Sequence, residues 1–323
     1  MKTIVMVCTS KKGPGPGGIL KDRWSGGTDV HDDTGVYDHT HINNLKRQLD
    51  DVGAEYDRMV AITNQNPRLV HRDVDVIPLP GGDEYTGWWS KMIMYNSNLR
   101  LDDAVLFVDL DMMPGGQFNQ LWDIHSDKDI VCRRAAHLDA TKPSVFLPAI
   151  SRPGDHNDHL AWIYNTSLVR FNPAKLAGLY NHYCTMVHNE YPLPELGDEL
   201  FVSRWLLENE DTIQHDEFPP RLMPSYPSLM STAARGETYD PNKPPAGKII
   251  KMGPMGLPAG VGGPPQNKQV ALMESVPQTD TVNSENNIPW DDLIAVTFGG
   301  PWKPWLIAKH DTHIRQRYYG TTE

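Results

Sequence analysis

Short apolar runs alternate with an amphipathic segment along the first third of the chain. Four runs have the length and composition of buried strands, and they lie at residues 3–8, 56–63, 74–79 and 105–108. Between the first two runs, apolar residues recur at helical spacing, which predicts a helix over residues 41–52. A second helix is predicted over residues 88–99. Strands that alternate with helices are typical of an α/β fold with a largely parallel sheet.

The rest of the chain continues this alternation. Further strands or apolar segments are predicted at residues 129–133, 161–171 and 293–298, and helices at residues 173–187 and 199–207. Asp198 and Glu199 lie at the start of the second of these helices, where the helix dipole favours negative charge. Helix capping is therefore an alternative to a catalytic role for these two acids.

Polar segments rich in glycine and proline separate the predicted elements. Residues 10–35 follow the first strand, and their glycines lack the spacing of a phosphate-binding loop. Residues 241–265 contain seven prolines and six glycines, too many for regular structure. A shorter polar stretch covers residues 278–287. Because no internal repeat or clean linker divides the chain, we expect a single elaborated domain.

Composition narrows the class of protein. The 323 residues carry a formal net charge of −11, which disfavours a large nucleic-acid footprint and an anionic membrane surface as the main partner. Three scattered cysteines make a disulfide framework improbable, and a reducing cytoplasm fits best. The apolar start is too short for a signal peptide, and no run is long enough to span a bilayer. We therefore expect a cytoplasmic protein.

The segment VLFVDLDMM, residues 105–113, is the strongest chemical motif. Asp109 and Asp111 interrupt a run that is otherwise apolar. Because side chains alternate along a strand, both carboxylates are expected to point the same way, and they repel each other unless a cation lies between them. Mg²⁺ or Mn²⁺ suits such an oxygen pair. The alternative is a solvated strand end with two ordinary surface acids.

Four segments, in order along the chain, resemble glycosyltransferases of the GT-A fold that use nucleotide-sugar donors, in particular the glycogenin-like and bacterial lipopolysaccharide galactosyltransferase-like group. They read WWSKMIMYNSNLRLDDAVLFVDLDMM, YNTSLVRFNP, GDELF and VTFGGPWKPW. The first contains the family's DxD motif, and the last is similar to its C-terminal His-Phe-x-Gly-x-x-Lys-Pro-Trp. The resemblance covers roughly residues 1–310 and leaves the long Gly/Pro-rich insertions unaccounted for.

The resemblance implies one GT-A-like domain with a mixed, mostly parallel sheet flanked by helices. Its Rossmann-like nucleotide-binding half would cover about residues 1–115. The acceptor-binding half would cover about residues 116–323 and include a coil insertion at residues 231–288.

The resemblance also implies a metal site and a donor. Asp109 and Asp111 would hold Mn²⁺ or Mg²⁺, which bridges the two phosphates of a nucleoside-diphosphate sugar, with a UDP-sugar as the first choice. Lys303 would add a positive charge on the same phosphates. Lys91 matches the family's basic residue beside the donor phosphate and sugar.

Other site residues follow from the same likeness. Asp198 matches the family's acid near the transferred sugar, where it would bind sugar hydroxyls or stabilise an oxocarbenium-like centre. Asn165 matches the strand residue that faces the reaction centre. Thr9 and Asn64, which follow the first two strands, would lie near the base and ribose. Trp305 is expected at the donor site, because aromatic faces stack on sugars and bases.

The chain departs from the family at one position. The C-terminal motif usually supplies a histidine as a third metal ligand, and Thr297 stands at the aligned position, with Gly299 the alternative if the motif is shifted. Water could complete the metal shell, His310 or His313 could reach back, or metal dependence could be weaker than in relatives.

Two other functions remain open from the sequence. A phosphohydrolase of the haloacid dehalogenase type also carries DxD, with Asp109 as nucleophile and Asp111 as acid/base, although such proteins usually place the motif on their first strand. The third possibility is a catalytically degenerate sugar-nucleotide-binding protein. The acceptor is not identified: a carbohydrate or glycoconjugate is favoured, and the acidic charge disfavours nucleic acid.

Overall fold

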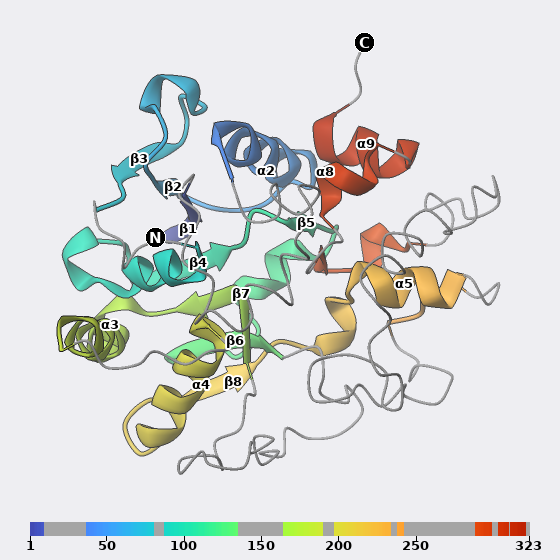
Figure 1. The fold of residues 1–323 in the computed structure, drawn as a ribbon. Helices are drawn as coiled ribbons and strands as arrows, with labels where there is room; N and C mark the ends of the chain where they lie inside the picture. Colours follow the sequence, from blue (N-terminus) through green and yellow to red (C-terminus); the bar gives the residue numbers. More distant parts are fainter. Residues whose placement is uncertain are drawn as a thin grey trace, which may run out of the picture.

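A seven-stranded mixed sheet forms the centre of the computed structural model (Figure 1). The structure describes residues 1–9, 37–80, 87–134, 164–189, 197–233, 238–241, 288–298, 303–309 and 311–320. The strands of the sheet are β1 (Lys2–Cys8), β2 (Arg58–Thr63), β3 (Asp75–Pro78), β4 (Ala104–Val108), β6 (Ile130–Arg134), β7 (Tyr164–Phe171) and β8 (His215–Glu217). The polar segments predicted at residues 10–35 and 278–287, and most of residues 241–265, lie outside the described residues.

The sheet has the order β3-β2-β1-β4-β7-β6-β8, and four of its six strand pairings are parallel. The first four strands of this order run the same way, so their carboxyl ends meet at one edge. Strand β7 pairs with β4 in the antiparallel sense, and β6 does the same with β7. The start of β7 and the end of β6 therefore lie at that same edge. The predicted mixed, mostly parallel sheet is confirmed.

The α-helices of the described residues are α2 (His39–Asp51), α3 (Pro173–His188), α4 (Asp198–Glu208), α5 (Tyr226–Ala233), α8 (Pro304–Ile307) and α9 (Thr312–Tyr319). The main sheet is covered by α2 on one face and by α3 and α4 on the other. Asp38 is the N-cap of helix α2, and its side chain accepts a hydrogen bond from the amide of Thr40. The prediction of a single α-helix over residues 88–99 was wrong. The segment forms two 3₁₀ helices, η4 (Gly87–Tyr95) and η5 (Ser97–Leu99). The described residues also form short 3₁₀ helices, which are η2 (Pro67–Leu69), η6 (Phe118–Trp122), η7 (Pro220–Leu222) and η8 (Trp290–Asp292).

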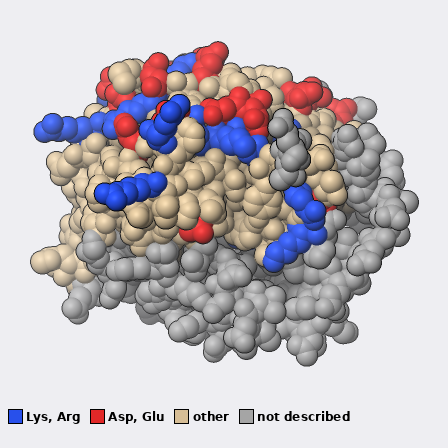
Figure 2. Space-filling view, turned by 90° about the horizontal axis from the view of Figure 1, so that it is seen from above, with Lys and Arg blue, Asp and Glu red and all other residues tan. Residues whose placement is uncertain are grey.

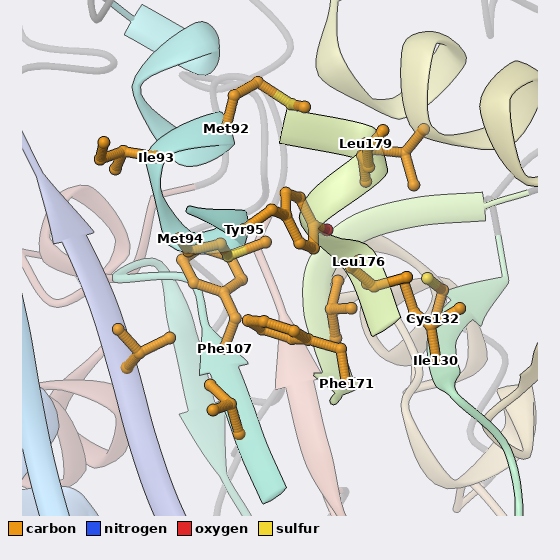
Figure 3. Close-up of a cluster of buried hydrophobic side chains, with 14 of the residues drawn as sticks. Met92, Ile93, Met94, Tyr95, Phe107, Ile130, Cys132, Phe171, Leu176 and Leu179 are labelled. Carbon is orange, nitrogen blue, oxygen red and sulfur yellow. The ribbon is translucent and has the colours of Figure 1, made fainter. Parts of the chain in front are cut away.

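Apolar side chains fill both faces of the sheet. One cluster joins η4, α3 and α4 to the sheet, with Tyr95 and Phe107 among the residues at its centre (Figure 3). Trp89 belongs to this side, stacked on Tyr183 with ring centroids 5.7 Å apart. The other face packs against α2 through Ile42, among other residues. The sheet is therefore buried on both faces, as the apolar strands predict.

A small second sheet attaches the C-terminal part to the main one. Strand β5 (Met112–Pro114) directly follows the turn after β4, and it pairs with β9 (Ala295–Thr297), the shortened form of the strand predicted at residues 293–298. A Cβ atom added at Gly115 would lie 2.3 Å from the carbonyl oxygen of Leu293, so only glycine permits this close approach. Helices α8 and α9 then lie beside α2 (Figure 1). The tail of the chain is thereby brought to the end of β4.

The surface carries charges of both signs. Figure 2 shows acidic and basic side chains interleaved over the described part of one face, without a continuous basic area. Among the described residues, no helix combines the length and apolar character needed to cross a bilayer.

Candidate functional site

The carboxyl edge of the sheet carries the two aspartates of the DxD motif. Strand β4 ends at Val108, and the chain then turns, with the amide of Met112 donating to the carbonyl oxygen of Asp109 at 3.1 Å. The prediction of one continuous strand through both aspartates was therefore wrong. Asp109 and Asp111 flank a turn, and each contacts a different lysine.

Asp109 forms an ion pair with Lys91 of η4. The Lys91 Nζ lies 2.7 Å from the Asp109 Oδ2, and each side chain is only 14% exposed. Burial alone would lower the pKa of Lys91, but the negative charges of Asp109 and Asp198 outweigh it and raise the pKa above its ordinary value. Lys91 is therefore a permanent cation at this edge.

Asp111 forms the second ion pair, with Lys303 from the C-terminal part of the chain. The two residues are separated by 192 positions in sequence, and both side chains are buried. Tyr37, just before α2, joins them: its hydroxyl oxygen lies 3.4 Å from the Lys303 Nζ and 3.5 Å from the Asp111 Oδ2. Burial raises the pKa of Asp111; the positive charge of Lys303 opposes this shift, and the negative charge of Asp109 adds to it. The pKa of Tyr37 is also raised, mainly by burial and then by the negative charge of Asp111.

Aromatic rings surround the ammonium group of Lys303. It lies 5.9 Å from the ring centroids of both Tyr37 and Trp305, within the range of cation–π attraction. Trp305 in turn contacts the rings of Tyr37 and His41 edge to face, at centroid distances of 5.6 and 4.5 Å. Pro304 begins α8 directly after Lys303, which fixes the backbone there. The lysine is consequently held in place on several sides.

Acidic and amide groups from α4 and β7 form the neighbouring part of the site. Asp198 is 3% exposed and accepts a hydrogen bond from the hydroxyl of Thr166. Burial raises the pKa of Asp198, although the charge of Lys91 offsets part of the shift. Asn165 donates to the carboxylate of Glu199. The helix N-cap is Gly197, and no side chain caps the helix, so neither acid serves as the cap.

Thr9 and Asn64 lie on the other side of β4. Thr9 directly follows β1 and is buried, and Asn64 directly follows β2 and is exposed. Because β2, β1 and β4 are parallel neighbours, these residues share the edge that carries Asp109. The order along the edge is Asn64, Thr9, the two aspartates, and then the polar groups of β7 and β6.

Asp109 and Asp111 could hold a divalent ion only if a substrate and water supplied the other ligands. Mg²⁺ is commonly bound by one or two carboxylates together with phosphate oxygens and water. The Thr297 hydroxyl is buried and lies 3.5 Å from the carbonyl oxygen of Pro224, and the ring of His313 lies beside Trp290. No third histidine, cysteine or acid completes a metal cluster among the described residues, and His310 and Gly299 lie outside them.

Two polar residues at this edge were not predicted from the sequence. Tyr37 follows the long Gly/Pro-rich segment, and no pattern marks it as close to Asp111. Arg133 on β6 is 7% exposed and directly follows the short apolar run IVC. In the sequence it is not distinguished from its neighbour Arg134, so no pattern marks it as a site residue.

Comparisons with known proteins support the fold. No protein-family model and no curated protein matches the chain. Among solved structures, the galactosyltransferase LgtC in complex with donor and acceptor sugar analogues matches with a TM-score of 0.50 and 10% identity, over 99% of this chain and 96% of LgtC. The apo form of the glycosyltransferase GlyE of Streptococcus pneumoniae TIGR4 matches with a TM-score of 0.44 and 10% identity, over 94% of this chain and 55% of GlyE. Together with the strand order, the likeness to LgtC shows that the chain has a GT-A-like fold.

Proposed function

We propose that this protein is a glycosyltransferase that moves a sugar from a nucleoside-diphosphate sugar to an acceptor. One observation carries the proposal: two lysines, from η4 and from the distant tail, meet the two aspartates at the end of β4. Two fixed cations beside two carboxylates suit a diphosphate and its counter-ion. The likeness to LgtC, which is described in complex with donor and acceptor sugar analogues, agrees with this class of ligand.

Each residue has a place in this reaction. Lys303 binds the diphosphate as a point charge, and Trp305 and Tyr37 keep it from moving. A divalent ion held by Asp109 and Asp111 would neutralise the charge that grows on the leaving nucleoside diphosphate. Thr9 and Asn64 would contact the base and ribose in this proposal.

The sugar lies toward β7 and α4 in this proposal. Asp198 accepts hydrogen bonds from sugar hydroxyls or stabilises positive charge at the anomeric carbon, and Asn165 faces the same centre. Lys91 holds Asp109 in position and adds positive charge beside the sugar-linked phosphate. The acceptor favoured by this arrangement is a carbohydrate or glycoconjugate.

The phosphohydrolase alternative has less support. Asp109 follows the fourth strand of the chain, whereas enzymes of the haloacid dehalogenase type usually carry the motif on their first strand.

Isothermal titration with a panel of nucleoside diphosphates, with and without Mn²⁺, tests the proposal. We expect at least one nucleotide to bind, more tightly with Mn²⁺, and the matching nucleotide-sugar to be turned over or slowly hydrolysed. Undiminished turnover in Asp109→Ala, or no binding of any nucleotide, would defeat the proposal. Phosphate release from an aryl phosphate would favour the phosphohydrolase, and binding without transfer or hydrolysis would favour a degenerate binding protein.

A further inference from the structure

Arg133 is a buried cation without a close anionic partner among the described residues. The residue is 7% exposed, and its Nε has no hydrogen-bond partner in the described part of the chain. The one side-chain hydrogen bond found there joins a terminal guanidinium nitrogen to the carbonyl oxygen of Met223 at 3.5 Å, the outer limit for such a bond. A buried guanidinium in this state is unfavourable unless something else satisfies it.

The adjacent arginine shows how this fold satisfies a buried guanidinium. Arg134 binds Glu217 of β8 through two nitrogens, one of which lies 2.6 Å from its carboxylate oxygen. Arg133 has no such carboxylate within ion-pairing distance in the described part of the chain. Glu199 and Asp111 act on it only as more distant charges. Despite their attraction, burial lowers the pKa of Arg133 to about 10.

The register of the sheet places Arg133 at the functional edge. Cys132 pairs with Val169, whereas Arg133 pairs with Asn165, so residues 166–168 of β7 form a bulge between these two pairings. Bulges next to active sites redirect side chains and strand ends. In this bulge, the carbonyl oxygen of Ser167 accepts a hydrogen bond from the amide N–H of Asp109, with the two atoms 2.8 Å apart. The bulge therefore connects Arg133 and Asn165 to the aspartate turn.

The position of Arg133 along the edge indicates which part of a ligand it meets. It lies two strands beyond β4, about 10 Å at the usual strand spacing, and on the side away from Thr9 and Asn64. Lys91 and Lys303 already lie at the end of β4, where the proposed diphosphate binds. The next part of the ligand in this direction is the transferred sugar or the acceptor.

We propose that Arg133 binds a negatively charged group, a carboxylate or a phosphate ester, on a sugar of the substrate pair. The planar guanidinium fork matches both groups through two parallel hydrogen bonds. The substrate class is then an acidic sugar, carried either by the donor or by the acceptor. This inference rests on the proposed glycosyltransferase function.

Ligands that differ only in charge test the inference. In the donor arm, UDP-glucuronate is compared with UDP-glucose, or the equivalent pair on whichever nucleotide binds. In the acceptor arm, methyl β-glucuronide and glucose 6-phosphate are compared with methyl β-glucoside, each titrated into protein saturated with the nucleoside diphosphate. We expect the acidic member to bind about tenfold or more tightly in one arm, because a charge-assisted hydrogen bond contributes that much.

Variants assign this preference to Arg133. Arg133→Met should reduce the preference for the acidic ligand to less than about twofold. Arg133→Lys should keep only part of this preference, because an ammonium group has the charge but lacks the guanidinium fork. Arg134→Gln, the matched control on the same strand, should leave the preference unchanged. Removal of an unsatisfied buried charge should also raise the thermal unfolding temperature of unliganded Arg133→Met, whereas Arg134→Gln should lower it because it removes the ion pair with Glu217.

Equal binding of acidic and neutral ligands by the wild-type protein in both arms would overturn the inference, and this comparison needs no variant. An undiminished preference in Arg133→Met would overturn it as well. Nucleotide binding without an acid preference contradicts this inference alone. If no nucleotide binds, the proposed function itself fails.

Discussion

The end of β4 and the end of β6 place positive charge at one edge of the sheet in different ways. At β4, each lysine contacts an aspartate, so the charges are balanced before any ligand arrives. At β6, Arg133 has no close carboxylate among the described residues. A balanced pair keeps its geometry but must exchange partners when a ligand binds. An unbalanced cation instead selects ligands that bring the missing charge.

The largest expected effect comes from breaking a balanced pair. Asp109→Asn should reduce transfer by at least about a hundredfold, because both the charge and the proposed metal ligand are lost. It should also lower the free energy of unfolding by about 3 kcal/mol, because Lys91 is left buried without its partner. Steady-state kinetics and urea unfolding measure the two effects.

The double variant Asp109→Asn/Lys91→Met separates these effects. It should recover much of the stability, since no unpaired charge remains, but none of the activity. Recovery of both would mean that the pair is only structural.

The second prediction concerns the pair formed with the tail of the chain. Lys303→Met should weaken nucleoside diphosphate binding about 10- to 100-fold, the range for a charge-assisted hydrogen bond. Lys309, an exposed lysine two residues after the end of α8, serves as the control, and Lys309→Met should bind the nucleotide normally. Titration calorimetry measures both variants. Equal loss in the two would indicate a general charge effect.

A third prediction uses the raised pKa of Asp198. Because its pKa is above the unfolded value, the folded state holds the proton more tightly, and this contribution to stability is lost as the pH rises through the folded pKa. Asp198→Asn should therefore gain stability over the wild-type protein as the pH rises from below 3.8 toward neutrality. Urea unfolding at a series of pH values tests the sign. A difference that is constant with pH would show that Asp198 titrates normally.

The smallest effect is expected at Tyr37. Its hydroxyl lies 3.4 Å from the Lys303 Nζ and 3.5 Å from the Asp111 Oδ2, which are long contacts. Tyr37→Phe should therefore weaken nucleotide binding only a few-fold, since the ring keeps its contact with Trp305. Tyr319→Phe, at a half-exposed ring, is the control. A loss as large as that of Lys303→Met would give the hydroxyl a direct role in binding.

The sequence predicted the fold where burial dictates the residue pattern. The apolar runs predicted β1, β2 and β4, and helical spacing predicted α2. The polar edge strand β8, His215–Glu217, was not predicted, because an edge strand needs few apolar residues. The 3₁₀ form of η4 was also not predicted, since its apolar stretch has no marked helical period.

The site was predictable only in part. Asp109 and Asp111 stand out as charges in an apolar run, whereas Arg133 follows a short apolar run and is not distinguished there from Arg134. The contact of Lys303 with Asp111 joins residues 192 positions apart, and no local pattern encodes it. Family resemblance alone pointed to that lysine. Tyr37 follows residues without any periodic pattern, and only the folded chain brings its hydroxyl to the ion pair.

A crystal structure obtained after soaking with a mixture of nucleotide-sugars tests the central claim most directly. We expect the diphosphate to lie between Lys303 and the two aspartates, with the base toward Thr9 and Asn64 and the sugar toward β7. A nucleotide bound elsewhere on the molecule, or a diphosphate at this edge with Lys303 turned away from it, would contradict the account.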